Sequence, residues 1–206
     1  AKVVGITGSA GKTTLKEILA HAFAAVGRQV SKTAGNFNNQ LGLPLSIFAA
    51  DEADDVWVLE VGVSRPGDMD ELAAILRPDV AVIHNVGPAH LEALGDVAGV
   101  AREKAKLLDR LATGGAVVAC VDYPELASEL NARPGTAAVT FSATFSGDGY
   151  RGESLGADHN GPAGSGLYRL YSPESPEGAV VRAPFVGAHF LENLLAALAT
   201  LELFGL

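Results

Sequence analysis

The chain has 206 residues, of which 48% are hydrophobic and 19% are charged, and its formal net charge is -9. This length is enough for one large domain with a buried core, and the composition is that of a globular protein. The acidic balance argues against a nucleic-acid-binding surface, because binding to phosphate backbones depends on clustered Lys and Arg. Any anionic ligand must therefore be held by a local group of residues.

The cysteine content and the sequence near the two ends of the chain indicate the cellular compartment. The single cysteine, Cys120, lies in an apolar run and has no partner for an internal disulfide, which favours a reducing, cytoplasmic setting. The opening residues do not resemble an export signal, and Glu192 and Glu202 interrupt the apolar C-terminal run, so membrane insertion is not expected. The chain opens directly into a strand, and we expect it to be part of a longer protein.

The first two thirds of the chain alternate between strand-like and helix-like patterns. Apolar runs of strand length recur at 3–6, 56–61, 80–83 and 116–121. Helical patterns lie between them at 13–26, 68–76 and from a cap at Asp96 to about 111. Strands that alternate with helices predict an α/β fold with a doubly wound, mostly parallel sheet.

The pattern changes after residue 131. A glycine-rich segment at 147–166 indicates a long loop, and two short strand candidates follow at 167–171 and 179–183. An amphipathic helix at about 189–204 closes the chain. We therefore expect one domain over 1–206: a nucleotide-binding core at about 1–135, a small antiparallel extension at about 136–187 and a closing helix at about 188–206.

A phosphate-binding loop is predicted between the first strand and the first helix. The segment reads Gly5-Ile6-Thr7-Gly8-Ser9-Ala10-Gly11-Lys12-Thr13-Thr14. Glycines let backbone N–H groups approach phosphate oxygens, Lys12 supplies a positive charge, and the Thr13 hydroxyl can bind magnesium. The general P-loop pattern requires glycine at Ile6, so the spacing departs from it. An unrelated glycine-rich turn is the alternative.

Polar residues follow two other predicted strands, at the edge of the sheet where ligands bind in such folds. Glu60 interrupts an apolar run, so either a structural salt bridge or a bound cation must compensate its charge. Asn85 and His90 follow the strand at 80–83, and His90 could equally be a cap or a core residue. His84, beside them, has no physical explanation from the sequence.

Lys104 lies at the centre of the apolar stripe of its predicted helix. A lysine on a buried face must extend to solvent, lose its charge or acquire a partner. A lowered pKa would leave a neutral amine that can react with carbon dioxide to give a metal-binding carbamate. The sequence alone leaves these outcomes open.

An asparagine-rich segment, Thr33-Ala34-Gly35-Asn36-Phe37-Asn38-Asn39, continues through Gly42-Leu43-Pro44. Asparagine beside glycine is ordinary turn chemistry. The amides could also bind a polar ligand or a phosphate oxygen. Spacing does not distinguish the two.

Together these segments resemble the central, ATP-binding domain of the Mur ligases, over nearly the whole chain. The family's short loop T-G-[ST]-x-G-K-T-[ST] matches 7–14 and accounts for the unusual spacing. Its acidic residue matches Glu60, its histidine matches His90 and its carbamylated lysine matches Lys104. Its closing motif G-x-H-N-x-x-N matches 187–193, except that Phe190 replaces asparagine.

The resemblance implies a set of residue roles. It places ATP on Gly8, Ser9, Ala10, Gly11, Lys12, Thr13 and Thr14, with Asn193 near the adenine. It places one Mg²⁺ on Thr13 and Glu60 and a second on His90 and carbamylated Lys104. Asn39 would approach the γ-phosphate, so the implied catalytic residues are Lys12, Asn39, His90 and Lys104.

The resemblance also implies the reaction. The asparagine-rich segment is most similar to that of the family members that join UDP-N-acetylmuramoyl-tripeptide to D-alanyl-D-alanine, a cytoplasmic step of peptidoglycan synthesis on which cell shape and division depend. Flanking N- and C-terminal domains would complete the substrate site, so this chain alone is expected to be nearly inactive. The alternatives are another Mur or folylpolyglutamate-type ligase and a non-catalytic P-loop module.

Overall fold

The computed structural model describes residues 1–144 and 149–206 and contains one continuous nine-stranded sheet. The strands are β1 Lys2–Thr7, β2 Val30–Lys32, β3 Val56–Glu60, β4 Val80–Ile83, β5 Ala116–Cys120, β6 Ala137–Ser142, β7 Tyr150–Ala157, β8 Gly166–Ser172 and β9 Ser175–Ala183. Their order is β2-β3-β1-β4-β5-β6-β7-β8-β9. Pairing is parallel from β2 to β7 and antiparallel from β7 to β9. The predicted α/β class, with its antiparallel extension, is confirmed.

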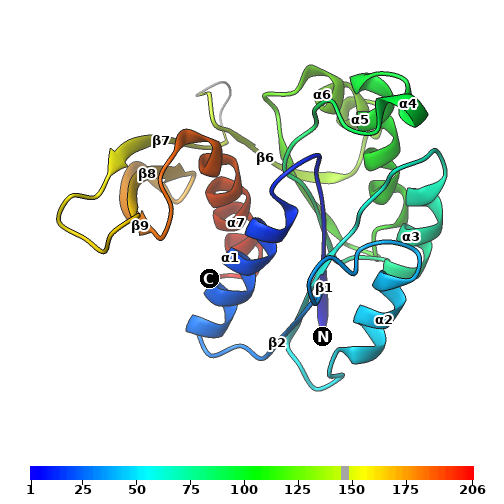
Figure 1. Cartoon of the computed structure of the whole chain (residues 1–206), viewed down its shortest axis with the longest axis horizontal. Coiled ribbons are helices and arrows are strands. Elements are labelled where there is room, and N and C mark those ends of the chain that lie inside the picture. Colours follow the sequence, from blue (N-terminus) through cyan, green and yellow to red (C-terminus); the bar gives the residue numbers. More distant parts are fainter. Residues whose placement is uncertain (145–148) are drawn as a thin grey trace.

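Helices cover both faces of the parallel part of the sheet. They are α1 Lys12–Ala25, α2 Gly42–Ala49, α3 Asp68–Leu76, α4 Leu91–Leu94, α5 Val97–Ala105, α6 Pro124–Asn131 and α7 Leu191–Leu203, with 3₁₀ turns η1 Lys106–Arg110 and η2 Ala188–Phe190. Figure 1 shows α1 and α7 side by side on one face and α2, α3 and α5 on the other. The Phe23 and Phe204 rings meet edge to face at 4.9 Å and join the first helix to the end of the chain.

Residues of β4 show why this central strand is apolar throughout. Val80 and Val82 pack into the cluster formed with α1 and α7. Ala81 and Ile83 pack into the opposite cluster, formed with α3 and α5. Because successive side chains of a strand point to opposite faces, a strand covered by helices on both faces has no polar position.

The glycine-rich segment differs from the loop that its composition predicts, and that prediction is wrong for much of its length. Eight of its residues form β7, while Gly147 and residue 148 lie outside the described part of the chain. A side-chain carbon on Gly152 would lie 2.9 Å from Leu191 Cδ1 and 2.8 Å from the Arg169 carbonyl oxygen. Glycine is used here for close packing of α7 on the sheet, which composition cannot distinguish from a flexible loop.

Other differences concern element ends. The helix predicted to continue to about 111 ends at Ala105, and the chain goes on as η1. The strand β6 and the short helices α2, α4 and α6 are not predicted by the sequence patterns. Within the described ranges, no helix is long and apolar enough to cross a membrane.

Candidate functional site

The loop between β1 and α1 presents backbone N–H groups at the N-terminus of a helix. Gly11 precedes α1 with φ +76°, a left-handed conformation that glycine adopts without strain, and no side chain caps the helix. An uncapped helix N-terminus has unpaired donors and a favourable dipole for anions. The loop is therefore built to accept phosphate groups.

Two lysine side chains converge on this loop. Lys12 Nζ donates to the Gly8 carbonyl oxygen at 2.9 Å, and Lys104 Nζ donates to the same oxygen at 3.1 Å. Lys104 is only 3% exposed, and its burial, followed by the charge of Lys12, lowers its pKa to about 7. Burial also lowers the pKa of Lys12, although the Glu60 carboxylate partly opposes this. A substantial fraction of Lys104 is thus a neutral amine near neutral pH.

Glu60 is fully buried at the carboxyl end of β3, and its two carboxylate oxygens contact different groups. Its Oε2 accepts from the Thr13 hydroxyl and from Asn38 Nδ2, each at 3.3 Å. Its Oε1 forms an ion pair with Lys16 Nζ at 3.2 Å. The structural salt bridge considered for Glu60 therefore exists, and its second oxygen still faces Thr13. Hydroxyl and carboxylate oxygens are the ligands that Mg²⁺ prefers, so this pair fits the predicted metal.

One cavity brings together all the predicted catalytic residues. It has a volume of about 270 Å³ and is lined by Lys12, Asn39, His90 and Lys104, among others. His90 is exposed at the start of α4 with φ +53°. Asn39 Oδ1 accepts from Leu41 N and Gly42 N, so the side chain also fixes the start of α2. Residues from separate segments thus meet beyond the ends of the parallel strands, where such folds bind ligands.

Asn85 holds the phosphate loop in place. Its Oδ1 accepts from Ser9 N at 2.8 Å and from Ala10 N at 3.1 Å. Its Nδ2 donates to the Ala10 carbonyl oxygen and, at 3.2 Å, to Glu192 Oε2. In this conformation two of the loop amides predicted to bind phosphate are bonded to Asn85 instead.

His84 lies beneath the same loop and explains Gly8. Its Nδ1 is 3.1 Å from the Thr7 carbonyl oxygen, and its Nε2 contacts the Ala10 carbonyl oxygen. A side-chain carbon on Gly8 would lie 2.3 Å from His84 Cε1, so only glycine fits. Burial, with the charges of Lys12 and Lys104, lowers the pKa of His84 to about 4 although both carbonyls favour the protonated ring. Sequence reasoning missed this role because the contact joins residues that are far apart in the chain.

Asn193 lies close to Gly11 of the phosphate loop. A side-chain carbon on Gly11 would lie 3.1 Å from Asn193 Oδ1, and this buried oxygen has no hydrogen-bond partner among the described residues. Nearby, the Phe190 ring stacks on Phe185 at 4.2 Å and contacts the His189 ring at 4.1 Å. An unpaired amide oxygen beside the loop is a feature that a ligand donor could satisfy.

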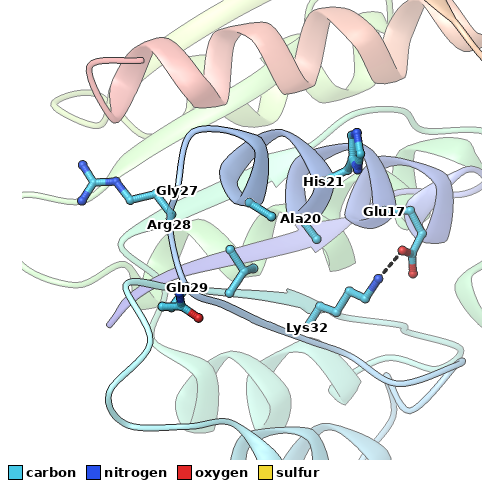
Figure 2. A pocket seen from close by; sticks show the side chains of 9 residues that line it. Glu17, Ala20, His21, Gly27, Arg28, Gln29 and Lys32 are labelled. Carbon is cyan, nitrogen blue, oxygen red and sulfur yellow. Dashed lines mark hydrogen bonds and ion pairs between the residues drawn. The ribbon is translucent and has the colours of Figure 1, made fainter.

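A second hollow, of about 510 Å³, lies beside α1 and β2 (Figure 2). It is lined by Glu17, Ala20, His21, Ala24, Gly27, Arg28, Gln29, Val30 and Lys32. Its charged groups are paired at the surface, Lys32 with Glu17 and Arg28 with Asp55. Size alone therefore does not make it the candidate site.

Comparison with known proteins agrees with the geometry. The family model of the Mur ligase middle domain matches residues 6–201. The chain belongs to the Mur ligase middle domain family. Mur ligase relatives named UDP-N-acetylmuramoyl-tripeptide--D-alanyl-D-alanine ligase include those of Bacillus subtilis, 32% identical over the whole of this chain, and Escherichia coli, 29% identical over 97% of it. The chain spans 42% of the length of each of these relatives.

Solved Mur ligase structures have the same fold. MurF from Acinetobacter baumannii superposes with a TM-score of 0.89 at 29% identity, covering all of this chain and 43% of that one. MurF from Thermotoga maritima, solved in complex with ADP, superposes with a TM-score of 0.83 at 33% identity, covering all of this chain and 46% of that one. FPGS from L. casei, at 18% identity and a TM-score of 0.75, shares the fold.

Proposed function

We propose that this chain is the ATP-binding domain of a ligase that joins UDP-N-acetylmuramoyl-tripeptide to D-alanyl-D-alanine in peptidoglycan synthesis. The observation that carries the proposal is the meeting of Lys12, Asn39, His90 and Lys104 in one cavity beside an uncapped helix N-terminus. The names of the relatives and the ADP bound to the Thermotoga maritima protein support the choice of substrates and nucleotide.

The phosphate loop would hold the ATP. Lys12 and the N–H groups at the start of α1 would bind the β- and γ-phosphates. Ser9 N and Ala10 N would join them only after exchanging Asn85 Oδ1 for a phosphate oxygen. Asn193, with its unpaired oxygen, would accept from the adenine amino group. Asn39 would lie near the γ-phosphate from the opposite wall of the cavity.

Thr13 and Glu60 would hold one Mg²⁺, and His90 with carbamylated Lys104 would hold a second. The neutral Lys104 amine would attack carbon dioxide, and loss of one proton from the nitrogen of the new N–C bond leaves a carbamate with the charge of a carboxylate. Bound Mg²⁺ would shield the negative charge of the phosphate oxygens and the substrate carboxylate.

Positioning and charge neutralisation would be the main contributions of this domain to the reaction. The tripeptide carboxylate attacks the γ-phosphorus and ADP leaves, giving an acyl phosphate. The amine of D-alanyl-D-alanine then attacks the acyl carbon, phosphate leaves and an amide forms. Lys12 would neutralise charge on the transferred phosphoryl group, and the wall of the cavity at Asn39 would restrict access of water.

Further domains of the same protein would complete the enzyme, since this chain spans less than half of its relatives. Uridine-nucleotide recognition would lie in a domain before this one, and part of the amine and adenine site would lie in a domain after it. The enzyme would act in the cytoplasm, where a free, buried thiol such as Cys120 stays reduced.

Two measurements test this proposal. Calorimetry on the 206-residue chain should show ADP binding in the presence of Mg²⁺, and Lys12→Met should weaken it at least about tenfold, while the exposed-site control Lys32→Met should not. Phosphate release by the longer protein should require both UDP-N-acetylmuramoyl-tripeptide and D-alanyl-D-alanine. Nucleotide hydrolysis that is independent of both would favour a switch module instead.

A further inference from the structure

Lys16 is a buried cation at the candidate site. It lies one turn after Lys12 on α1, and its side chain is 2% exposed. Its Nζ forms an ion pair with Glu60 Oε1 at 3.2 Å and donates to the Thr33 carbonyl oxygen at 2.9 Å. A buried lysine is expensive unless acceptors surround it, and here they do.

The same ammonium group joins Glu60 to the start of the asparagine-rich segment. Besides Thr33, Lys16 Nζ contacts the Gly35 carbonyl oxygen at 3.4 Å. The Thr33 hydroxyl oxygen in turn accepts from Glu60 N at 2.9 Å. Both the backbone and the carboxylate of Glu60 are therefore fixed, with Oε1 turned towards Lys16 and Oε2 towards Thr13.

This arrangement has an electrostatic consequence for any cation that approaches Oε2. The carboxylate supplies one negative charge, and Lys16 already compensates it from the other oxygen. Glu17 Oε1 also lies 3.2 Å from Lys16 Nζ, but the charge of Glu17 is in turn compensated by Lys32. Lys12, whose Nζ lies at the Gly8 carbonyl oxygen, adds positive charge to the same region. In a site of low dielectric, a divalent cation therefore meets repulsion that offsets the attraction of Glu60.

Phosphate groups reverse this balance. A triphosphate held on the loop adds several negative charges next to Thr13, and the net attraction for a cation then becomes strong. The fixed carboxylate remains available through Oε2 as a single oxygen ligand, which suits the strict geometry of Mg²⁺.

We propose that Lys16 keeps divalent metal out of the empty site, so that metal binds at Thr13 and Glu60 only together with nucleotide phosphates. Lys16 is then a positioning residue: it acts on the metal through Glu60 and does not itself contact the nucleotide or the other substrates. The inference rests on the proposed function, because it takes Glu60 as a metal ligand. Metal ions would arrive with the nucleotide rather than before it.

Calorimetric titration of the 206-residue protein with Mg²⁺, with and without ADP, tests the inference. In the natural protein, Mg²⁺ alone should bind weakly and ADP should tighten its binding. Lys16→Met should bind Mg²⁺ alone at least about tenfold more tightly, because the repulsion is removed. Two control variants should behave like the natural protein. Lys32→Met removes an exposed lysine that pairs with Glu17 of α1. Lys16→Arg keeps the positive charge at position 16.

A purely structural role for Lys16 gives a different result, since a loosened site would bind metal more weakly. Folded Lys16→Met with unchanged or weaker binding of Mg²⁺ alone would overturn the inference, as would a gain of binding in Lys16→Arg. If circular dichroism shows that Lys16→Met does not fold, the natural protein decides: binding of Mg²⁺ that is equally tight with and without ADP contradicts the inference. Absence of ADP binding to the natural protein would instead contradict the proposed function and the inference with it.

Discussion

Two ion pairs on either side of α1 differ in what surrounds them. Lys16 and Glu60 are both nearly inaccessible to solvent and lie beside the phosphate loop. Lys32 and Glu17 form their pair at the surface, in the larger hollow of Figure 2, where both side chains are about half exposed. Glu17 Oε1 also lies 3.2 Å from Lys16 Nζ, so the two pairs are joined in one chain of charges that runs from the buried site to the surface.

The difference shows why the smaller hollow is the better candidate site. An exposed pair is screened by water and contributes little to stability. Buried charges keep a fixed geometry and a strong field, which is what a phosphate or metal site needs. Volume alone would favour the hollow beside α1 and β2, of about 510 Å³, over the cavity at the phosphate loop, of about 270 Å³.

The largest effect is expected at the buried lysine of α5. Lys104→Ala should lower ligation by the longer protein about 100-fold to 1000-fold, because it removes the group proposed to carry the carbamate. Short carboxylates such as formate or acetate should partly restore activity by occupying the space left by the side chain. Arg102→Ala, at a 66% exposed side chain two residues earlier, is the control and should remain active. Full activity of Lys104→Ala without added carboxylate would rule out the carbamate.

Removal of the carboxylate from each ion pair should lower the free energy of unfolding by different amounts at the buried and the exposed pair. Glu60→Gln leaves Lys16 buried with less compensation, and urea unfolding should show a loss of about 3 kcal/mol, near the lower end for a broken buried pair because Glu17 stays 3.2 Å from Lys16. Glu17→Gln should cost less than about 1 kcal/mol. Equal losses for the two variants would mean that burial of the Lys16–Glu60 pair has no energetic consequence.

A smaller effect is expected for His84, and its sign follows from the lowered pKa. The pKa of this ring is about 4 in the folded chain, against an ordinary value of 6.5 when it is exposed by unfolding, so only the unfolded chain binds the proton between these values. Stability should therefore fall as the pH decreases from 6.5 to 4, by about 3 kcal/mol in total from this group.

The His84→Gln variant should lack this part of the pH dependence, as measured by urea unfolding at several pH values. His21→Gln, at an exposed position of α1, is the matched control. An unchanged acid slope in His84→Gln would show that the buried ring is not the group responsible.

The core of the fold could be predicted from the sequence because its signals are local. Apolar runs such as 80–83 are covered on both faces, and the loop at 7–14 has its pattern in consecutive residues. β7 could not be predicted, since Gly152 serves a close contact with Leu191 that is distant in the sequence.

The candidate site divides in the same way. Lys12 was found from the loop motif, His90 from a strand end and Lys104 from its buried position on its helix. Asn39 was assigned only through the family resemblance. Lys16 and His84 were missed as site residues because their partners, Glu60 and the loop carbonyls, become neighbours only in the folded chain. The one local signal for Lys16 is its position four residues after Lys12, between the buried Leu15 and Leu19.

The packing of α1 against α7 has a consequence for synthesis of the chain. The apolar face of the first helix, including Phe23, is covered by residues near the end of the chain, such as Phe204. During translation this face, next to the phosphate loop, stays uncovered until α7 has left the ribosome. Contacts of such long sequence separation slow folding and leave apolar surface open to aggregation or to chaperones. The nucleotide-binding loop is therefore made well before the helix that completes the packing beside it.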